Sequence, residues 1–427
     1  MLSHDEKDRK PRVANPVLAA FAIFAQYPVL IPLALATLFA QLTYSGINNV
    51  GVPKYIDILD IPREGQVIGA LTATFLLAET FLRVPFGWMS DRFGRTRMIV
   101  GALLLSAPTV LISGLVPGYR GLFVLRAWDG AMAAALWPSI YALIGDNVPE
   151  RFRANAMGVI NMMYMLALFI GGALGLVAFK ATGNPRTFFF IGAALFTVGG
   201  VLAYLFLRKR QLTNPHEETH QEEEACDPVP FARHAILLTI TFTQTFAITA
   251  LAPFMIRYAT DPVLKGGLGF NDLQLALLVG APVAGVGLFA LPLSRLSDII
   301  GKLNAVRLAF AAIAVMLWVF AFFHQLPVLA LTAMVIGVAF AMGVPAWLAI
   351  LSSLSGCRSR GMTLAGYGTV QGIASVLGPL AAGWVWDNIG HGQIFLLSAA
   401  SVSLAALLAW TALPNQRSHT QNRYETV

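Results

Sequence analysis

The sequence has 427 residues, of which 57% are hydrophobic and only 12% are charged, and its formal net charge is +7. Soluble domains carry about 25% charged residues, so this composition excludes an ordinary soluble enzyme or binding domain. The positive charge does not indicate a nucleic-acid partner, because the basic residues lie in short segments between long apolar runs. We therefore expect a protein whose surroundings are a lipid bilayer.

Twelve apolar runs follow one another along the chain, each near the length of about 20 residues that crosses a bilayer as a helix. The runs lack the two-residue alternation of a transmembrane β-barrel, and a spanning helix satisfies its own backbone groups. We therefore predict an all-α membrane protein. The predicted spans are residues 28–50, 66–88, 97–117, 121–145, 154–178, 187–207, 235–257, 273–294, 303–323, 327–352, 361–385 and 392–413.

A polar segment divides the spans into two groups of six. Residues 208–234 are acidic in the middle and poor in hydrophobic residues, which is typical of a flexible linker. The expected organisation is a tail over 1–27, a first half over 28–207, the linker, a second half over 235–413 and a tail over 414–427. Of the 29 Lys and Arg residues, 19 fall on the side of the two termini and 7 on the other. This bias predicts that both termini are cytosolic, and the compact loops suit a bacterial inner membrane.

Residues 85–171 match residues 292–378 at a constant offset of 207 residues, without gaps. A parallel repeat of six helices plus six predicts a substrate site between the halves, near the middle of the bilayer. The matched pairs include Pro85 with Pro292, Asp91 with Asp298, Gly94 with Gly301, Gly130 with Gly337, Pro138 with Pro345 and Gly171 with Gly378.

Residues 87–97 read G-W-M-S-D-R-F-G-R-T-R. They resemble the loop signature between the second and third helices of the major facilitator superfamily (MFS), and the resemblance covers essentially the whole chain. It implies a twelve-helix fold of two parallel repeats, and a latch that holds the halves together on the cytosolic side in the outward-open state. The alternative is a basic loop that only sets topology. The expected latch residues are Gly87, Asp91, Arg92, Gly94, Arg95, Asp298 and Gly301.

Four ionisable residues lie inside predicted spans, where charges are costly and commonly functional. Glu79 and Arg83 are four residues apart, and Arg126 and Asp129 are three apart, so each pair shares one helix face. Residues 122–134 resemble the fourth-helix signature of the family, whose arginine is associated with proton coupling. A carboxylate beside an arginine can load and release a proton, so all four are candidates for coupling. The alternative, favoured for Glu79 with Arg83, is a permanent ion pair inside the membrane that holds the helices in register.

Polar and aromatic side chains inside the spans are candidates for a substrate cavity, because such linings suit amphipathic organic solutes. The family resemblance implies that the first, fourth, seventh and tenth helices line that cavity. Each side chain has an alternative role in contacting lipid or neighbouring helices. The candidates are Gln41, Tyr44, Asn48, Asn49, Trp137, Gln244, Trp347 and Gln371.

Sequence motifs for nucleotide binding, metal binding and nucleophilic catalysis are absent, so we expect no cofactor, no metal and no enzymatic activity. The leading hypothesis is a monomeric secondary active transporter that works by alternating access and exports a small organic or amphipathic solute in exchange for protons. The exporter signature G-P-x-x-G-G is only partly present, since residues 171–176 read G-G-A-L-G-L. One alternative is uptake of a small organic anion by proton symport, with Arg126 binding its carboxylate. A more remote one is a membrane receptor that transports nothing.

Overall fold

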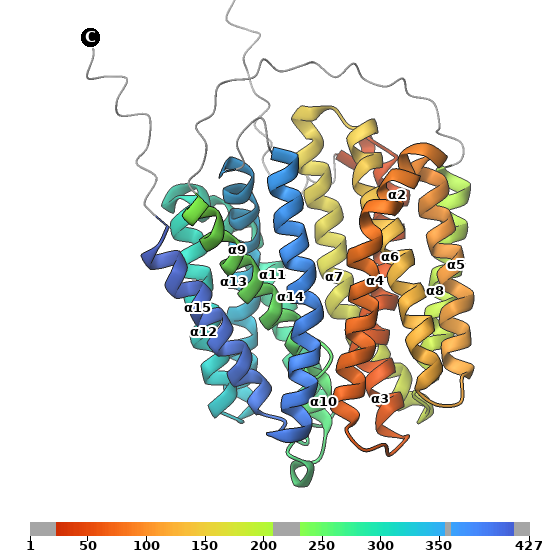
Figure 1. Ribbon diagram of the computed structural model, residues 1–427, viewed down its shortest axis with the longest axis vertical. Coiled ribbons are helices and arrows are strands. Elements are labelled where there is room, and N and C mark those ends of the chain that lie inside the picture. Colours follow the sequence, from red (N-terminus) through yellow and green to blue (C-terminus); the bar gives the residue numbers. More distant parts are fainter. Residues whose placement is uncertain (1–22, 208–230, 355–359, 414–427) are drawn as a thin grey trace, which may run out of the picture.

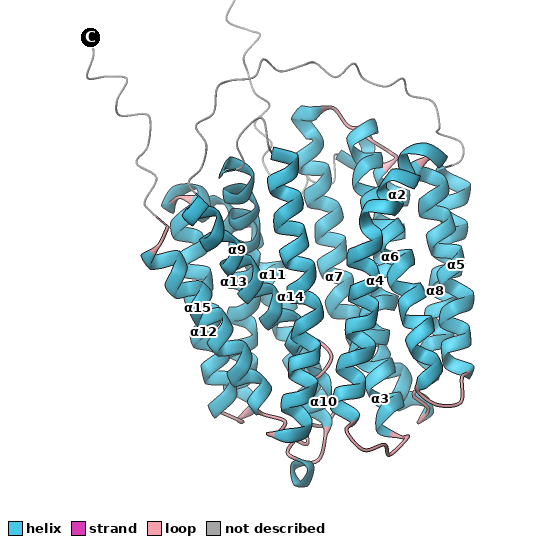
Figure 2. Cartoon of the chain, in the orientation of Figure 1, coloured by secondary structure: helices cyan, strands magenta, loops and turns pink. Residues whose placement is uncertain are grey.

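A computed structural model describes residues 23–207, 231–354 and 360–413. Within these ranges the chain is helical and without strands, and short loops join the helices at the two ends of a bundle (Figure 2). The first half holds α2 (Leu30–Gly46), the π-helical η2 (Ile47–Gly51), α3 (Val52–Asp57), α4 (Glu64–Phe93), α5 (Arg95–Leu115), α6 (Arg120–Asn147), α7 (Glu150–Thr182) and α8 (Thr187–Leu207). The second half holds α9 (Phe231–Leu251), α10 (Met255–Thr260), η4 (Val263–Lys265), α11 (Asp272–Ile300), α12 (Lys302–Phe322), α13 (Leu326–Leu354), α14 (Arg360–Asn388) and α15 (Gln393–Thr411).

Ten of the twelve predicted spans correspond to one long helix each. The first covers the continuous run α2–η2–α3, and the seventh runs past the end of α9 at Leu251 into α10. In the described part of the chain, nine of these segments are long and apolar enough to cross a membrane by length and composition alone. Several helices extend beyond the predicted ends, as α4 does through Asp91 to Phe93. Hydropathy marks only the part of each helix that crosses the hydrocarbon core, whereas the helix itself continues into the polar headgroup layer.

The helices form two side-by-side groups, with α2–α8 on one side and α9–α15 on the other (Figure 1). We call the end of the bundle that holds Leu30, Leu207 and Thr411 the terminal face, and it is uppermost in Figure 1. The opposite end, which holds Asp57, Glu64 and the short helix α10, is the distal face. The predicted tails and most of the linker lie outside the described residues.

Glycine contacts show the internal repeat in three dimensions. A Cβ atom at Gly130 would lie 2.1 Å from the carbonyl oxygen of Phe75, and one at Gly337 would lie 2.5 Å from that of Pro282. Both glycines and both partners are separated by the offset of 207 residues. The same close helix contact therefore occurs once in each half, between α6 and α4 and between α13 and α11.

The two halves contact each other along α4 and α14, and near the distal face the two helix backbones come close to each other. A Cβ atom at Gly69 would lie 2.2 Å from the carbonyl oxygen of Pro379, and one at Gly383 would lie 2.3 Å from that of Gly65. Small residues at such positions let helix backbones touch, which is how membrane helices gain packing energy. We call these four residues the distal seam.

We expect Gly130→Ala to lower the thermal stability of the protein in detergent. The added methyl group must push α6 away from α4, and overpacking of this kind costs about 1–3 kcal/mol. The measurement is the midpoint of thermal unfolding. Gly101→Ala on α5 is the matched control, because a Cβ atom there meets nothing within 4 Å. Equal midpoints for the two variants would contradict the prediction.

Candidate functional site

A cavity of about 160 Å³ lies between the two halves. The first half supplies most of its lining, and the second half supplies Thr249, Ala252 and Pro253. Asn48 and Asn49 lie in the π-helical turn η2, a local irregularity that is frequent at functional sites. Five of the eight side chains expected from the sequence line this cavity: Gln41, Tyr44, Asn48, Asn49 and Trp137.

The remaining three expected residues do not line this cavity. Gln244 is half-buried on α9, and Gln371 is exposed on α14. Trp347 is buried within the second half, where its ring centroid lies 5.9 Å from that of Phe310. Their assignment to substrate binding stays a prediction.

Aromatic residues that the sequence analysis did not propose complete the wall. Phe75 on α4 and Tyr164 on α7 both line the cavity. The Tyr164 ring meets Trp137 edge to face, with 5.2 Å between ring centroids. The sequence signal was an aromatic residue within a span, but periodicity alone does not say which way a helix is rotated. Thr72, Leu76, Leu168 and Ser45 also line the cavity.

Glu79 is the one charged side chain among the described residues that line the cavity. Nη2 of Arg83 donates a hydrogen bond to Oε1 of Glu79 at 2.8 Å. Arg83 lies one turn nearer the terminal face and its side chain is 47% exposed. Arg83 is therefore the less enclosed member of the pair, since the Glu79 side chain is 13% exposed.

A second ion pair lies behind the cavity wall. Arg126 and Asp129 on α6 are completely enclosed, at 1% and 0% exposure, and the guanidinium donates to the carboxylate. Nη1 of Arg126 also donates to Oδ1 of Asn48 at 2.9 Å, and the guanidinium lies 5.6 Å from the centroid of the Phe75 ring. Asn48 and Phe75 line the cavity, so they connect this pair to it.

The buried pair leaves hydrogen-bonding capacity unused. Oδ1 of Asp129 and Nε of Arg126 are buried and have no hydrogen-bond partner among the described residues. The Tyr44 hydroxyl donates to the backbone carbonyl of Asp129 at 3.4 Å, and not to its side chain. A buried acceptor without a partner is costly, so this carboxylate oxygen has the capacity to accept a hydrogen bond from a further donor.

On the distal face a buried arginine joins the two halves. Nε of Arg257, on α10, donates to Asp261 at 3.0 Å, and Nη2 donates to Asp57 at 3.1 Å and also to Glu64. Asp57 and Glu64 belong to the first half. Lys54 of the first half lies 3.4 Å from Asp261 of the second. We call these five residues, together with Asp387, the distal gate.

Asp387 adds backbone hydrogen bonds to the distal gate. Its two carboxylate oxygens accept from the amides of Gly65 at 2.9 Å and Gln66 at 2.8 Å. A residue of α14 therefore caps the first turn of α4, where amide groups lack partners within the helix. This cap exists only while the distal seam is closed.

The loop after α14 packs against the gate. Trp386 stacks on His391 with 3.9 Å between ring centroids, and the guanidinium of Arg257 lies 5.5 Å from the Trp386 ring. Burial lowers the pKa of the His391 imidazole below its ordinary value, so the ring stays neutral beside this cation.

The expected latch residues on the terminal face pair within the first half. Arg95 contacts Asp91 at 3.4 Å and Asp146 at 2.9 Å, and Arg92 lies over the ring of Trp88. The Asp91 side chain is 69% exposed. None of these charges forms a salt bridge to a described residue of the second half.

The latch glycines have different settings. Gly94 ends α4 with φ 97°, and its repeat mate Gly301 ends α11 with φ 86°, a backbone that side chains rarely adopt. A Cβ atom at Gly87 would meet nothing within 4 Å. The side chain of Asp298 lies outside the described residues.

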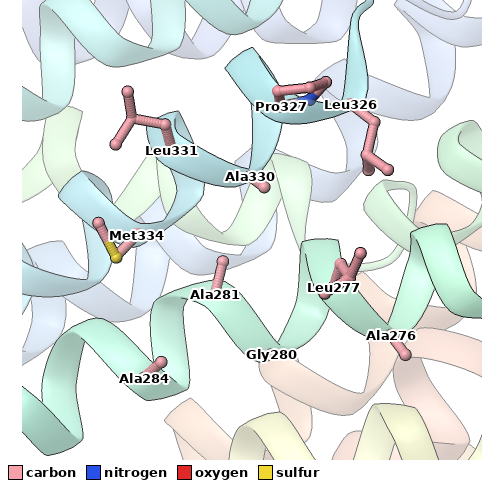
Figure 3. Close-up of a pocket in the computed structure, with 10 residues that line it drawn as sticks. All are labelled: Ala276, Leu277, Gly280, Ala281, Ala284, Leu326, Pro327, Ala330, Leu331 and Met334. Carbon is pink, nitrogen blue, oxygen red and sulfur yellow. The ribbon is translucent and has the colours of Figure 1, made fainter.

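A different cavity, of about 470 Å³, lies between α11 and α13 (Figure 3). Every side chain that lines it is apolar, so it offers no polar group to orient a solute. The lining residues are Ala276, Leu277, Gly280, Ala281, Ala284, Leu326, Pro327, Ala330, Leu331 and Met334.

The model of the Major Facilitator Superfamily matches residues 17–261 and again residues 237–426. The chain belongs to the Major Facilitator Superfamily. The two matches cover the two halves, as the internal repeat requires, and the expected fold of two six-helix parallel repeats is confirmed. This chain is therefore a multi-pass membrane transporter of small solutes.

Similar MFS proteins carry names from drug resistance. Multidrug resistance protein 1 of Bacillus subtilis (strain 168) is 23% identical over 393 residues, which are 92% of this chain and 99% of that protein. Multidrug resistance protein MdtG of Salmonella paratyphi B is 25% identical over 371 residues, which are 86% of this chain and 91% of that protein. The crystal structure of the POT family transporter PepTSo shares the fold, with a TM-score of 0.69, 13% identity, and coverage of 90% of this chain and 97% of that one.

We expect Arg257→Gln to open the distal face. Three carboxylates would lose their shared cation, and removing one partner of a buried pair costs about 3–5 kcal/mol. The measurement is the rate at which a membrane-impermeant thiol reagent, added from the distal side, labels Leu76→Cys in the cavity, in a Cys226→Ser, Cys357→Ser background. The rate should rise at least about tenfold, which corresponds to 1.4 kcal/mol.

Arg186→Gln is the matched control for this experiment. Arg186 is also a distal arginine, but it lies over the ring of Tyr55 and so contacts its own half. A labelling rate that rises equally in both variants would show that the loss of any distal charge, and not of the gate, is responsible.

Proposed function

We propose that this protein exports small amphipathic organic compounds in exchange for protons, by alternating access across a bacterial inner membrane. The observation that carries the proposal is the cavity between the halves, whose wall combines aromatic rings, amides and one carboxylate. The names of the relatives, which are multidrug resistance proteins, support export as the direction of transport. The excess of basic residues supports a cytosolic terminal face.

The contrast between the two faces supports alternating access. On the distal face, ion pairs and a helix cap join the halves. On the terminal face, the latch residues Asp91 and Arg95 pair within one half, and Asp91 is exposed to solvent. The latch would exchange these partners for contacts with the second half when the distal face opens. In the proposed cycle, the arrangement described here would be the cytosol-facing state.

The chemistry of the cavity favours compounds that carry a positive charge on an apolar body. Trp137, Tyr164 and Phe75 present ring faces and edges, which bind apolar groups and attract cations. A substrate cation that displaced Arg83 would take over the pairing with Glu79. The carboxylate would then be neutralised either by arginine or by cargo, and never buried alone.

Asp129 is the proposed proton carrier. In the described state Arg126 pairs with it, while one carboxylate oxygen has no partner among the described residues. Asn48 bonds to Arg126 and also lines the cavity, so the contents of the cavity would be coupled to this ion pair through Asn48. For exchange, Asp129 would take up its proton in the state open to the distal side, where the guanidinium separates from the carboxylate. It would release the proton in the cytosol-facing state, where the pair with Arg126 forms again.

The alternative of anion uptake has less support. It requires Arg126 to reach a substrate carboxylate, whereas Arg126 is enclosed and already bonded to Asp129 and Asn48. A receptor role without transport is excluded if purified protein carries a substrate across liposomes. Both alternatives make different predictions in the two experiments that follow.

Expression in an efflux-deficient bacterial host should raise resistance to toxic amphipathic cations more than to anions of similar size. Growth across a panel of such compounds is the measurement. Glu79→Gln should lose most of the resistance to cations and keep that to neutral compounds, because only cations need the carboxylate. Asp60→Asn is the matched control, since Asp60 is an exposed carboxylate in a distal loop. Increased sensitivity of the wild-type strain would instead indicate uptake.

Asp129→Asn should uncouple transport from protons in proteoliposomes. We expect a pH gradient to drive uphill transport by the wild-type protein and not by the variant, which should still carry substrate down its own gradient. Arg126→Lys should impair coupling similarly under export, whereas under anion uptake it should abolish binding. Uphill transport that survives Asp129→Asn and Glu79→Gln would remove both residues as carriers.

A further inference from the structure

A groove of about 500 Å³ lies on the outer surface of the bundle near the distal face. It belongs to neither the central cavity nor the gate. Residues from α4, α6 and α14 form its wall, so both halves contribute to it. Its lining includes Arg63, Gln66, Val67, Phe123, Leu380 and Trp384.

The apolar wall of the groove faces the bilayer. Trp384 is 53% exposed and Leu380 is 40% exposed on the surface of α14. They precede the distal end of that helix by four and eight residues, or about 6 and 12 Å along its axis. This is the depth of lipid headgroups and of the first part of the acyl chains, where tryptophan is enriched.

A cation lies at the mouth of the groove. Arg63 precedes α4 and is exposed, and it forms no salt bridge with a described residue. The adjacent carboxylate of Glu64 is already bound to Arg257 in the gate, so it does not neutralise Arg63. The guanidinium is therefore available to an anion from outside the protein.

The backbone at Arg63 is held in an unusual conformation. Its φ of 59° and ψ of 44° are left-handed, a region that residues with a side chain rarely adopt. Such strain tends to occur at ligand sites. Here it accompanies a basic side chain that lines the groove just before the first turn of α4.

We infer that this groove binds a phospholipid, with the phosphate of the headgroup on Arg63 and an acyl chain along Phe123, Leu380 and Trp384. Arginine holds phosphate by two parallel hydrogen bonds, and the Gln66 side chain adds a polar group at the same end. The single unpaired cation favours a headgroup with one net negative charge, such as that of phosphatidylglycerol.

Binding in this groove would stabilise the closed distal face. The lipid would contact α4 from one half and α14 from the other, immediately beside the distal seam. Opening that seam separates the two walls, so the lipid binds the closed state more tightly and shifts the protein towards it. This consequence rests on the proposed alternating access, whereas lipid binding itself does not.

The binding test is native mass spectrometry of the full-length protein released from nanodiscs of phosphatidylcholine with phosphatidylglycerol. The wild-type protein should retain phosphatidylglycerol, and Arg63→Gln and Trp384→Ala should each retain at most about a tenth as much, a loss of 1.4 kcal/mol. Arg120→Gln is the matched control, because Arg120 is exposed on the same end of the bundle but does not line the groove. Inorganic phosphate added in detergent should not compete for the retained lipid. Equal retention by all four proteins, or its loss to phosphate alone, would overturn the inference.

The conformational test uses spin labels on Ile58→Cys and Leu264→Cys, two exposed distal positions in opposite halves, in the cysteine-free background. Phosphatidylglycerol should increase the population with the short distance in the wild-type protein and leave it unchanged in Arg63→Gln. A response that is the same in both proteins would remove the proposed effect on the seam. Because transport is not measured here, a failed export assay would leave the lipid result standing.

Discussion

Between two helices in a bilayer there is little hydrophobic driving force, because lipid tails are as apolar as leucine side chains. Association has to come from close backbone contact and from polar groups that find partners. This molecule uses both at the same places. Gly69 and Gly383 let α4 and α14 touch, and one turn away Asp387 caps the first turn of α4. Close backbone contacts and polar contacts between the halves therefore lie together at a few specific positions.

Polar contacts at a few positions suit a protein that has to separate its halves repeatedly. A large apolar interface would be slow to open, whereas a network around one arginine can be exchanged for another set of polar contacts. The buried arginines also depend on a few specific partners. Arg257 is compensated by three carboxylates in this state, and Arg126 by Asp129 and Asn48. Each of these sets of partners exists in one arrangement of the helices. A movement of the helices therefore changes the electrostatic free energy of Arg257 and Arg126.

Hydropathy predicted the twelve spans because a bilayer imposes one length and one polarity on every helix. The offset of 207 residues predicted the repeated glycine positions, and the contacts of Gly130 and Gly337 show why they recur. The cavity was harder to predict, since a polar residue such as Gln371 has the same sequence signal whether it faces a cavity or lipid. The gate was missed because Lys54 and Arg257 were counted only as charges that set topology. The acidic residues in the same loops were the sequence signal that Lys54 and Arg257 form ion pairs.

Lys54 and Asp261 are separated by the repeat offset of 207 residues, yet they contact each other. Lys54 lies within α3, whereas Asp261 follows the last residue of α10, so the offset joins two different local settings. The first half brings the cation to this contact and the second half brings the carboxylate. Closing the distal face with these two side chains therefore takes one half of each kind.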